Sequence, residues 1–214
     1  MKISISYPPL ESPKGIPCLT QNRQFQWFNN PTYIYPVIPA YAASLLAKHG
    51  YDVFWNDGIA QELSYQKWLE ILVQEKPNLV AIETKTPVVE MHWKIIDEIK
   101  QKLPATKIVL MGDHVTAFPQ ESLQKCKVDY VITSGDYDFM LLNLANHLSK
   151  SASLEGGFWY RNEAGSVENF GPSNLATHNL NNLPLIDRKL TRWKDYAYKN
   201  GNFKYKPGAY MMSG

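Results

Sequence analysis

Short apolar runs alternate with amphipathic segments through the first 150 residues of the chain. Five runs have the length and composition of buried strands, and they span residues 2–7, 51–56, 79–83, 107–111 and 129–133. Between them, apolar residues recur every three or four positions, which is typical of helices that bury one face. We expect four such helices, at residues 39–49, 65–76, 89–103 and 139–148.

Polar and turn residues mark where these helices begin and end. Ser64 stands directly before a stripe of apolar residues and has the side chain of a helix N-cap. Pro77 and Pro104 follow the second and third helices, where proline stops a helix. Gly50 follows the first helix as a C-terminal cap. The pattern therefore predicts separate helices between successive strands.

Strands that alternate with helices indicate βαβ units and a parallel sheet covered on both faces. We predict an α/β protein with a doubly wound, five-stranded parallel sheet of flavodoxin-like (Rossmann-like) type, in the order 2-1-3-4-5. The pattern changes after residue 149. Residues 157–161 and 166–170 read as a β-hairpin with Gly165 in its turn, and residues 172–184 read as a linker.

Composition narrows the class of protein. The chain has 214 residues, of which 44% are hydrophobic and 20% are charged, and its formal net charge is +2. These values are those of a globular domain, and no apolar run approaches the roughly 20 residues that cross a bilayer. The N-terminus lacks the apolar core of a secretory leader, so we expect a soluble, cytoplasmic protein. Two cysteines, Cys18 and Cys126, are too few for a disulfide framework or an iron–sulfur cluster.

In an open parallel sheet, ligands bind beyond the carboxyl ends of the strands. Glycines and hydroxyl side chains are frequent after the third, fourth and fifth predicted strands. Hydroxyls can hydrogen-bond to a ligand, and glycine lets the backbone approach it closely. A structural explanation stays open, because loops are rich in these residues anyway. The five strand ends are Tyr7-Pro8-Pro9, Asn56-Asp57-Gly58, Glu83-Thr84-Lys85-Thr86, Met111-Gly112-Asp113-His114-Val115-Thr116 and Thr133-Ser134-Gly135-Asp136.

The residues at the strand ends disfavour several ligand classes. The chain contains no Gly-x-Gly, so it has neither a dinucleotide fingerprint nor a phosphate-binding P-loop. The first strand ends without the acidic pair of a phosphoryl receiver. A metal site of Asp113, His114 and Asp136 is conceivable, but adjacent side chains usually diverge. A flavin remains possible and would need phosphate donors after the first strand, where the candidates are Ser12, Lys14, Gly15 and Thr20.

Only one histidine is expected at the carboxyl edge of the sheet. His114 follows the fourth strand. His49 and His147 lie near predicted helix C-termini, where a solvated histidine is favoured by the helix dipole. We expect His92 on a helix surface and His178 in the linker.

Four segments, taken in order, resemble the N-terminal cobalamin-binding domain of B12-dependent radical SAM proteins. They are ISYPPL at residues 5–10, PAYAASLLAKHGYDV at 39–53, GDHVTAFP at 112–119 and DYVITSGD at 129–136. The resemblance covers about residues 1–150. It extends more weakly to GFWYR at 157–161 and to LNNLPLIDR at 180–188, which looks like the connector before the catalytic barrel.

The resemblance implies a set of residues that contact cobalamin. Thr84 and Thr86 match a Ser/Thr-rich loop after the third strand. Gly112 matches the second glycine of a Gly-Gly loop in which Met111 replaces the first. His114 and Thr116 match a Gly-Pro-His-Pro-Thr pattern, with Asp113 and Val115 as replacements. Gly135 and Asp136 match a turn after the fifth strand. The full set of implied cofactor-binding residues is Tyr7, Pro8, Thr84, Thr86, Gly112, Asp113, His114, Thr116, Gly135 and Asp136.

The resemblance also implies how cobalt is coordinated. Many cobalamin modules carry Asp-x-His-x-x-Gly after the first strand, with the histidine as the lower ligand of cobalt. No histidine precedes His49 in this chain. We therefore expect cobalamin with its own base displaced and without a histidine in its place.

Three regions follow from this assignment: a cobalamin-binding domain at residues 1–150, a hairpin and connector at 151–187, and at 188–214 a linker or the start of a radical SAM domain. The Cys-x-x-x-Cys-x-x-Cys motif of that domain is absent. The [4Fe-4S] cluster, S-adenosylmethionine and the catalytic residues of a methyltransferase or oxidative cyclase would belong to the missing domain. The chain alone is then a binding domain whose partners are cobalamin and the radical SAM domain.

The end of the chain leaves a third possibility open. Seven Lys or Arg side chains and two Asp lie between Asp187 and Lys206, interleaved with aromatic residues. Such a pattern can bind single-stranded nucleic acid. The simpler explanation is that this segment has been separated from the domain it normally contacts. We therefore expect neither nucleic acid nor a membrane as a partner.

Overall fold

The computed structural model describes residues 1–19, 25–133, 135–162, 164–199 and 204–209. Five strands run parallel in its central sheet: β1 (Lys2–Tyr7), β4 (Asp52–Asp57), β5 (Leu79–Glu83), β6 (Lys107–Met111) and β7 (Tyr130–Ile132). Their order is β4-β1-β5-β6-β7, which confirms the predicted order 2-1-3-4-5. The chain reverses its winding between β1 and β5, so the topological switch point lies between these two strands.

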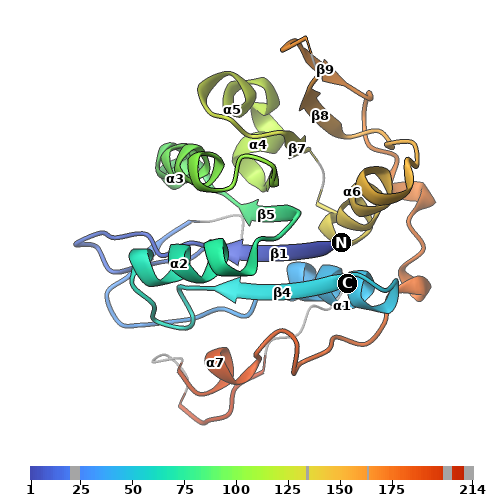
Figure 1. Cartoon of the computed structure of the whole chain (residues 1–214). Coiled ribbons are helices and arrows are strands. Elements are labelled where there is room, and N and C mark those ends of the chain that lie inside the picture. Colours follow the sequence, from blue (N-terminus) through green and yellow to red (C-terminus); the bar gives the residue numbers. More distant parts are fainter. Residues whose placement is uncertain (20–24, 134, 163, 200–203, 210–214) are drawn as a thin grey trace.

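Helices cover both faces of the sheet (Figure 1). α1 (Val37–Lys48) packs against α6 (Tyr137–Lys150) on one face, and α2 (Tyr65–Glu75), α3 (Val89–Lys102) and α5 (Pro119–Lys125) cover the other. The predicted cap of α2 is confirmed, because the Ser64 hydroxyl accepts a hydrogen bond from the backbone N–H of Lys67 at 3.2 Å. The buried face of α2 consists of Trp68, Leu69 and Leu72. Among the described residues, no helix is long and apolar enough to cross a bilayer.

The predicted hairpin extends the sheet beyond β7. β8 (Phe158–Arg161) pairs antiparallel with β7, and β9 (Val167–Asn169) pairs antiparallel with β8. Gly165 in the turn has a φ of +84°, a conformation that glycine adopts without strain. The hairpin therefore covers the edge of β7, which would otherwise be unpaired on that side.

Two regions differ from the sequence prediction. Residues 112–119 lie in none of the four predicted helices, but they contain the short helix α4 (Asp113–Ala117), and α5 begins at Pro119. The stretch between β1 and α1 has its own small ladder of β2 (Ile16–Pro17) and β3 (Trp27–Phe28). Both features are too short to show the periodicity of a helix or strand in the sequence. Elements of this length are stable only through contacts with the rest of the fold.

The segment after the hairpin runs back along the molecule in short turns. It contains the 3-10 helices η2 (Leu175–Thr177) and η3 (Leu180–Asn182) and the helix α7 (Lys194–Ala197). Figure 1 shows α7 beyond the β4 edge of the sheet. Tyr196 and Ala197 of α7 are each 2% exposed. This part of the basic, aromatic segment therefore packs on the domain, and Phe203 and residues 210–214 lie outside the described residues.

Candidate functional site

The carboxyl edge of the sheet is covered on one half and open on the other. Over the ends of β1 and β4, residues 17–19 and 32–34 and Tyr196 of α7 line a cavity of only about 30 Å³, which also borders Tyr7 and Asp57. Pro8 is buried in this half. The loops after β5, β6 and β7 remain accessible, and we call them the open edge. The predicted site residues that are exposed at the open edge are Thr86, Asp113, Thr116 and Gly135.

A buried hydrogen-bond network closes the covered half. The Tyr196 hydroxyl donates to Oδ2 of Asp57 at 2.5 Å and accepts from Nε1 of Trp55 at 3.0 Å. The backbone N–H of Ala60 donates to the other oxygen of Asp57 at 2.8 Å. Burial raises the pKa of Asp57 to about 6, although these hydrogen bonds favour the ionised form. Both oxygens of Asp57 are thus occupied, and its role is structural.

Glu83 lies at the border between the two halves, at the end of β5. Its side chain is 4% exposed, and Oε2 accepts a hydrogen bond from the Tyr7 hydroxyl at 2.8 Å. Oε1 has no hydrogen-bond partner among the described residues. Burial raises the pKa of Glu83 to about 7, opposed by the Tyr7 hydrogen bond and by the charge of Lys85. This carboxyl group is therefore poised to change its charge near neutral pH.

An ion pair joins the loops after β5 and β6. Nζ of Lys85 lies 2.5 Å from Oδ2 of Asp113. The Lys85 side chain is only 7% exposed, whereas that of Asp113 is 54% exposed. The pair fixes α4 against the end of β5 and brings one predicted site residue, Asp113, to the open edge.

The hydroxyl of Thr84 points into the protein. Thr84 and His92 are both completely buried, and Nδ1 of His92 lies 2.8 Å from Oγ1 of Thr84. Burial lowers the pKa of His92 to about 3, so the ring is neutral. Our expectation that His92 lies on a helix surface was wrong. His92 is three residues after Val89 and four before Ile96, both buried, so helical periodicity could have placed it on the buried face of α3.

His114 is held by its neighbours. Its Nδ1 lies 3.2 Å from Oγ1 of Thr86, and its Nε2 lies 3.1 Å from Oε2 of Glu121. The ring also contacts Trp93 and Phe118, with centroid distances of 6.1 and 5.6 Å. Both ring nitrogens are therefore engaged, and His114 orients Thr86 at the open edge.

A second histidine, His178, reaches the edge from the connector. Its Nδ1 lies 2.9 Å from Oδ2 of Asp136, and its Nε2 lies 3.1 Å from Oε2 of Glu155. Its ring stacks on Phe139 with centroids 4.8 Å apart. Burial acts to lower the pKa of His178, but the two carboxylates together raise it. The sequence analysis placed His178 in a linker and expected His114 as the one histidine at this edge. The contact with Asp136 shows that His178 lies there as well.

The two predicted glycines have different surroundings. Gly112 has a φ of +123°, and a Cβ there would lie 2.2 Å from the backbone oxygen of Thr84. This glycine is required by the fold, because it lets the β6–α4 turn touch the loop after β5. A Cβ at Gly135 would meet nothing within 4 Å. Gly135 therefore borders open space, where a side chain would compete with a ligand.

The structure thus gathers Thr86, Asp113, Thr116, Gly135 and Asp136 around the loops after β5, β6 and β7. It does not assemble the conceivable metal site, because Asp113 pairs with Lys85 while Asp136 pairs with His178. No group of three His, Cys, Asp or Glu side chains within the described ranges could hold a metal ion. Of the donors considered for a flavin phosphate, Thr20 lies outside the described residues.

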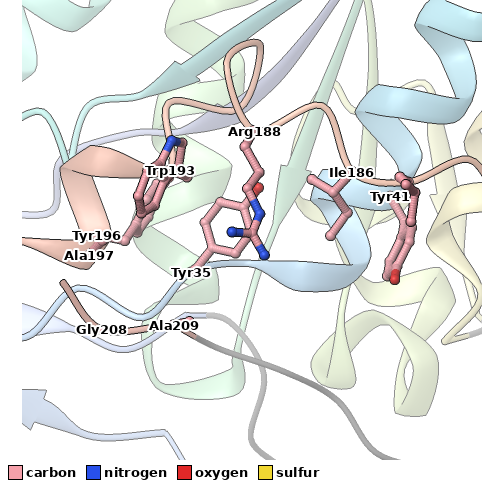
Figure 2. A pocket seen from close by; sticks show the side chains of 10 residues that line it. Tyr35, Tyr41, Ile186, Arg188, Trp193, Tyr196, Ala197, Gly208 and Ala209 are labelled. Atoms are coloured by element: carbon pink, nitrogen blue, oxygen red, sulfur yellow. The ribbon is translucent and has the colours of Figure 1, made fainter.

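A larger pocket lies between the connector and the start of α1 (Figure 2). It has a volume of about 340 Å³, and its lining includes the aromatic rings of Tyr35, Tyr41 and Trp193 together with Arg188 and aliphatic residues. In Figure 2 the Arg188 side chain extends from the connector towards Tyr35, and its guanidinium lies 5.8 Å from the Trp193 ring centroid. This volume is near the lower end for drug-sized ligands. It is too small for a ligand of the size of cobalamin.

Comparison with known proteins points to one family. Residues 31–142 match the B12 binding domain family. The chain is 27% identical over 163 residues to an uncharacterized methyltransferase, PH0819, of Pyrococcus horikoshii, covering 75% of this chain and 35% of the relative. It is 25% identical over 172 residues to the anaerobic magnesium-protoporphyrin IX monomethyl ester cyclase of Cereibacter sphaeroides, covering 77% and 27%. The chain thus spans about a third or less of these relatives.

Solved structures share the fold. The radical S-adenosylmethionine methyltransferase TsrM of Kitasatospora setae, with cobalamin and a [4Fe-4S] cluster bound, matches with a TM-score of 0.58 and 19% identity, over 81% of this chain and 29% of TsrM. The cobalamin-dependent S-adenosylmethionine radical enzyme OxsB, with aqua-cobalamin bound, matches with a TM-score of 0.67 and 14% identity, over 91% and 25%.

These matches agree with the sheet order and with the resemblance seen in the sequence. They give no support to a flavin enzyme or to a nucleic-acid-binding protein. Because the family match covers more than half of the residues, the chain belongs to the B12-binding domain family, and it resembles the corresponding domains of B12-dependent radical SAM enzymes.

Proposed function

We propose that this chain binds cobalamin across the open edge and presents it to a radical SAM catalytic domain. The observation that carries the proposal is the division of the carboxyl edge into two halves. Over β1 and β4 the edge is closed, whereas the ends of β5, β6 and β7 offer Thr86, Asp113 and Thr116 beside Gly135, at which a Cβ would meet only open space.

The residues present fit such a ligand. Thr86 and Thr116 carry exposed hydroxyls, and Asp113 carries an exposed carboxylate. These groups suit the many carboxamide side chains that surround a corrin ring, because hydroxyl and carboxylate oxygens accept hydrogen bonds from amide N–H groups. Glu83 contributes a buried carboxyl group with one unpaired oxygen, among the described residues, at the same edge.

We propose further that cobalamin is bound with its own base displaced and without a histidine ligand. No histidine precedes His49 in the sequence, so none can follow β1 directly. His114 and His178 have both ring nitrogens engaged by neighbouring side chains. His92 is completely buried and bonds to Thr84. His114 and His178 would each have to give up an existing contact before approaching cobalt, and the unpartnered Nε2 of His92 is buried inside the protein.

The proposed partner is a catalytic domain that carries the [4Fe-4S] cluster and S-adenosylmethionine, as in a B12-dependent radical SAM methyltransferase or oxidative cyclase. Bound cobalamin would supply a cobalt centre that can carry a methyl group. This chain's residues would bind and orient the corrin and shield its lower face, and the substrate would be held by the partner domain.

The test is the electron paramagnetic resonance spectrum of cob(II)alamin mixed with the protein. We expect a binding-dependent spectrum without the three-line splitting that an axial nitrogen produces. The variants His114→Ala and His178→Ala should give the same spectrum as the unmodified protein. A splitting that disappears in either variant would identify that histidine as the ligand and overturn the base-displaced, histidine-free state. Failure of cobalamin to bind at all would overturn the proposed function.

A further inference from the structure

Glu83 is a buried carboxyl group of the carboxyl edge that is only half satisfied by its neighbours. Oε2 accepts a hydrogen bond from Tyr7, but Oε1 has no partner among the residues that the structure describes. Asp57, equally buried at the end of β4, has both oxygens occupied by Tyr196 and the backbone of Ala60. Among the described residues, the fully buried side-chain atoms without a hydrogen-bond partner belong to Asn56 and His92, and Oε1 of Glu83 is not one of them. This oxygen is therefore accessible at the edge, where it can accept a hydrogen bond from a ligand.

The position of Glu83 suits contact with a ligand at the open edge. It ends β5, one of the two strands that flank the switch point, and the exposed hydroxyl of Thr86 follows three residues later. Its Tyr7 partner ends β1, the other strand of the switch point. Oε2 of Glu83 is thus held by Tyr7 of the covered half, and the residues that follow Glu83 in the chain belong to the open edge.

The charges around Glu83 are mixed. Lys85 favours its ionised form, and Asp113 opposes it. Cys18 and Tyr137 also interact electrostatically with Glu83. Their pKa values are raised mainly by burial, so both are uncharged at neutral pH. Tyr7, also with a pKa well above its usual range, keeps its proton and donates a hydrogen bond to the Glu83 carboxyl group. Within the described part of the chain, the cation that faces Glu83 is therefore Lys85, and this lysine already pairs with Asp113.

We propose that Glu83 is a direct ligand contact whose unpaired oxygen accepts a hydrogen bond from a carboxamide N–H of the corrin rim, so that cobalamin binding displaces a proton from Glu83. The inference rests on the proposed function and adds to it a specific contact and a pH dependence. A carboxylate accepts a stronger hydrogen bond than a carboxylic acid does. The ligand and the proton therefore compete for this side chain.

The size of the effect follows from the titration of the free protein. Because burial holds the pKa of Glu83 at about 7, about half of the molecules carry this proton at pH 7. Binding at pH 7 should release about half a proton per ligand. Affinity should fall as the pH is lowered below 7 and should level off about fivefold to tenfold lower, where Glu83 is protonated in the free and in the bound protein. Above pH 8 the affinity should no longer depend on this group.

The experiment is calorimetric titration of the full chain with methylcobalamin, in buffers with different heats of ionisation. The visible spectrum of the same samples records binding independently. Glu83→Gln keeps the size and the Tyr7 contact but cannot lose a proton. We expect it to lose the proton release and to bind about fivefold to tenfold more weakly at pH 8. Glu75→Gln, at the opposite end of the sheet, is the matched control and should behave like the unmodified protein.

A second variant tests the same contact from the Tyr7 side. The Tyr7 hydrogen bond favours the ionised form of Glu83. Tyr7→Phe should therefore raise the pKa of Glu83 and move the pH range of proton release upwards. Equal proton release from the unmodified protein and Glu83→Gln, or proton uptake on binding, would overturn the inference. If neither the unmodified protein nor the variants changed the methylcobalamin spectrum, the proposed function itself would be wrong.

Discussion

Gly112 and Gly135 offer a sharp comparison between a glycine needed for folding and one that borders the ligand site. Replacing Gly112 with alanine places a Cβ 2.2 Å from the backbone oxygen of Thr84 in a backbone conformation with φ of +123°. Side chains are strained in such a conformation by about 1–3 kcal/mol. Forcing an extra carbon into a packed site costs about another 1–3 kcal/mol.

We therefore expect Gly112→Ala to lower the free energy of unfolding by about 4 kcal/mol. For a chain of this length, that corresponds to a fall of about 8–16 °C in melting temperature. Gly135→Ala should melt within about 3 °C of the unmodified protein, because its Cβ meets nothing within 4 Å. Its methyl group would instead occupy the open edge and weaken cobalamin binding about tenfold, which equals about 1.4 kcal/mol.

Calorimetric melting of both variants without ligand, and spectroscopic titration with cobalamin, measure the two effects separately. Gly165→Ala is the control for left-handed strain without a clash, since Gly165 has a φ of +84° and open surroundings. It should lose less stability than Gly112→Ala. Melting of Gly112→Ala within about 2 °C of the unmodified protein would refute the assigned close approach. Unchanged cobalamin affinity of Gly135→Ala would remove Gly135 from the site.

Three further outcomes can be measured without a catalytic domain. Tyr196→Phe removes a hydrogen bond to the carboxylate of Asp57, so urea unfolding at pH 8 should show a free energy of unfolding lower by about 1–3 kcal/mol. The loss should be smaller at pH 5, where Asp57, with a pKa of about 6, is largely protonated. Glu83→Gln should stabilise the ligand-free protein at pH 8 by up to about 3 kcal/mol, because it removes the cost of burying an ionised carboxylate. That cost is absent below pH 4.5 and develops as the pH rises through about 7, the raised pKa of Glu83. Equal stability of the two proteins at pH 8 would contradict this. His178→Gln should speed proteolysis of the connector below pH 6.5, and the unmodified protein should approach the same rate as the pH rises through the raised pKa of His178.

The sequence alone determined the architecture of the domain. Residues 2–7, 79–83 and 107–111 were predicted as strands and appear with those bounds. The Ser64 cap and the Gly165 turn were also confirmed. These features follow from local rules, since alternation and helical periodicity decide which residues can be buried, and capping or turn residues decide where an element ends. The B12-binding family was reached from the same local segments.

The short elements were beyond local rules. α4 has five residues, and β2 and β3 have two residues each. Segments of this length do not hold their conformation alone, so their contacts with the rest of the fold decide their shape. The same is true of α7, whose Tyr196 packs on the covered half of the edge although its sequence resembles an unpartnered basic, aromatic tail.

Only the tertiary structure decided how the side chains of the site are paired. Tyr7 meets Glu83 across 76 residues, Asp136 meets His178 across 42, and Asp57 meets Tyr196 across 139. The sequence named Tyr7 and Asp136 as site residues but carried no sign of these partners. The physical reason is that such pairs depend on strand register and helix packing, whereas periodicity reports only whether a position faces the interior. Burial and pairing then set the ionisation of Glu83, so the charge of this site is a property of the fold and not of any segment of the chain.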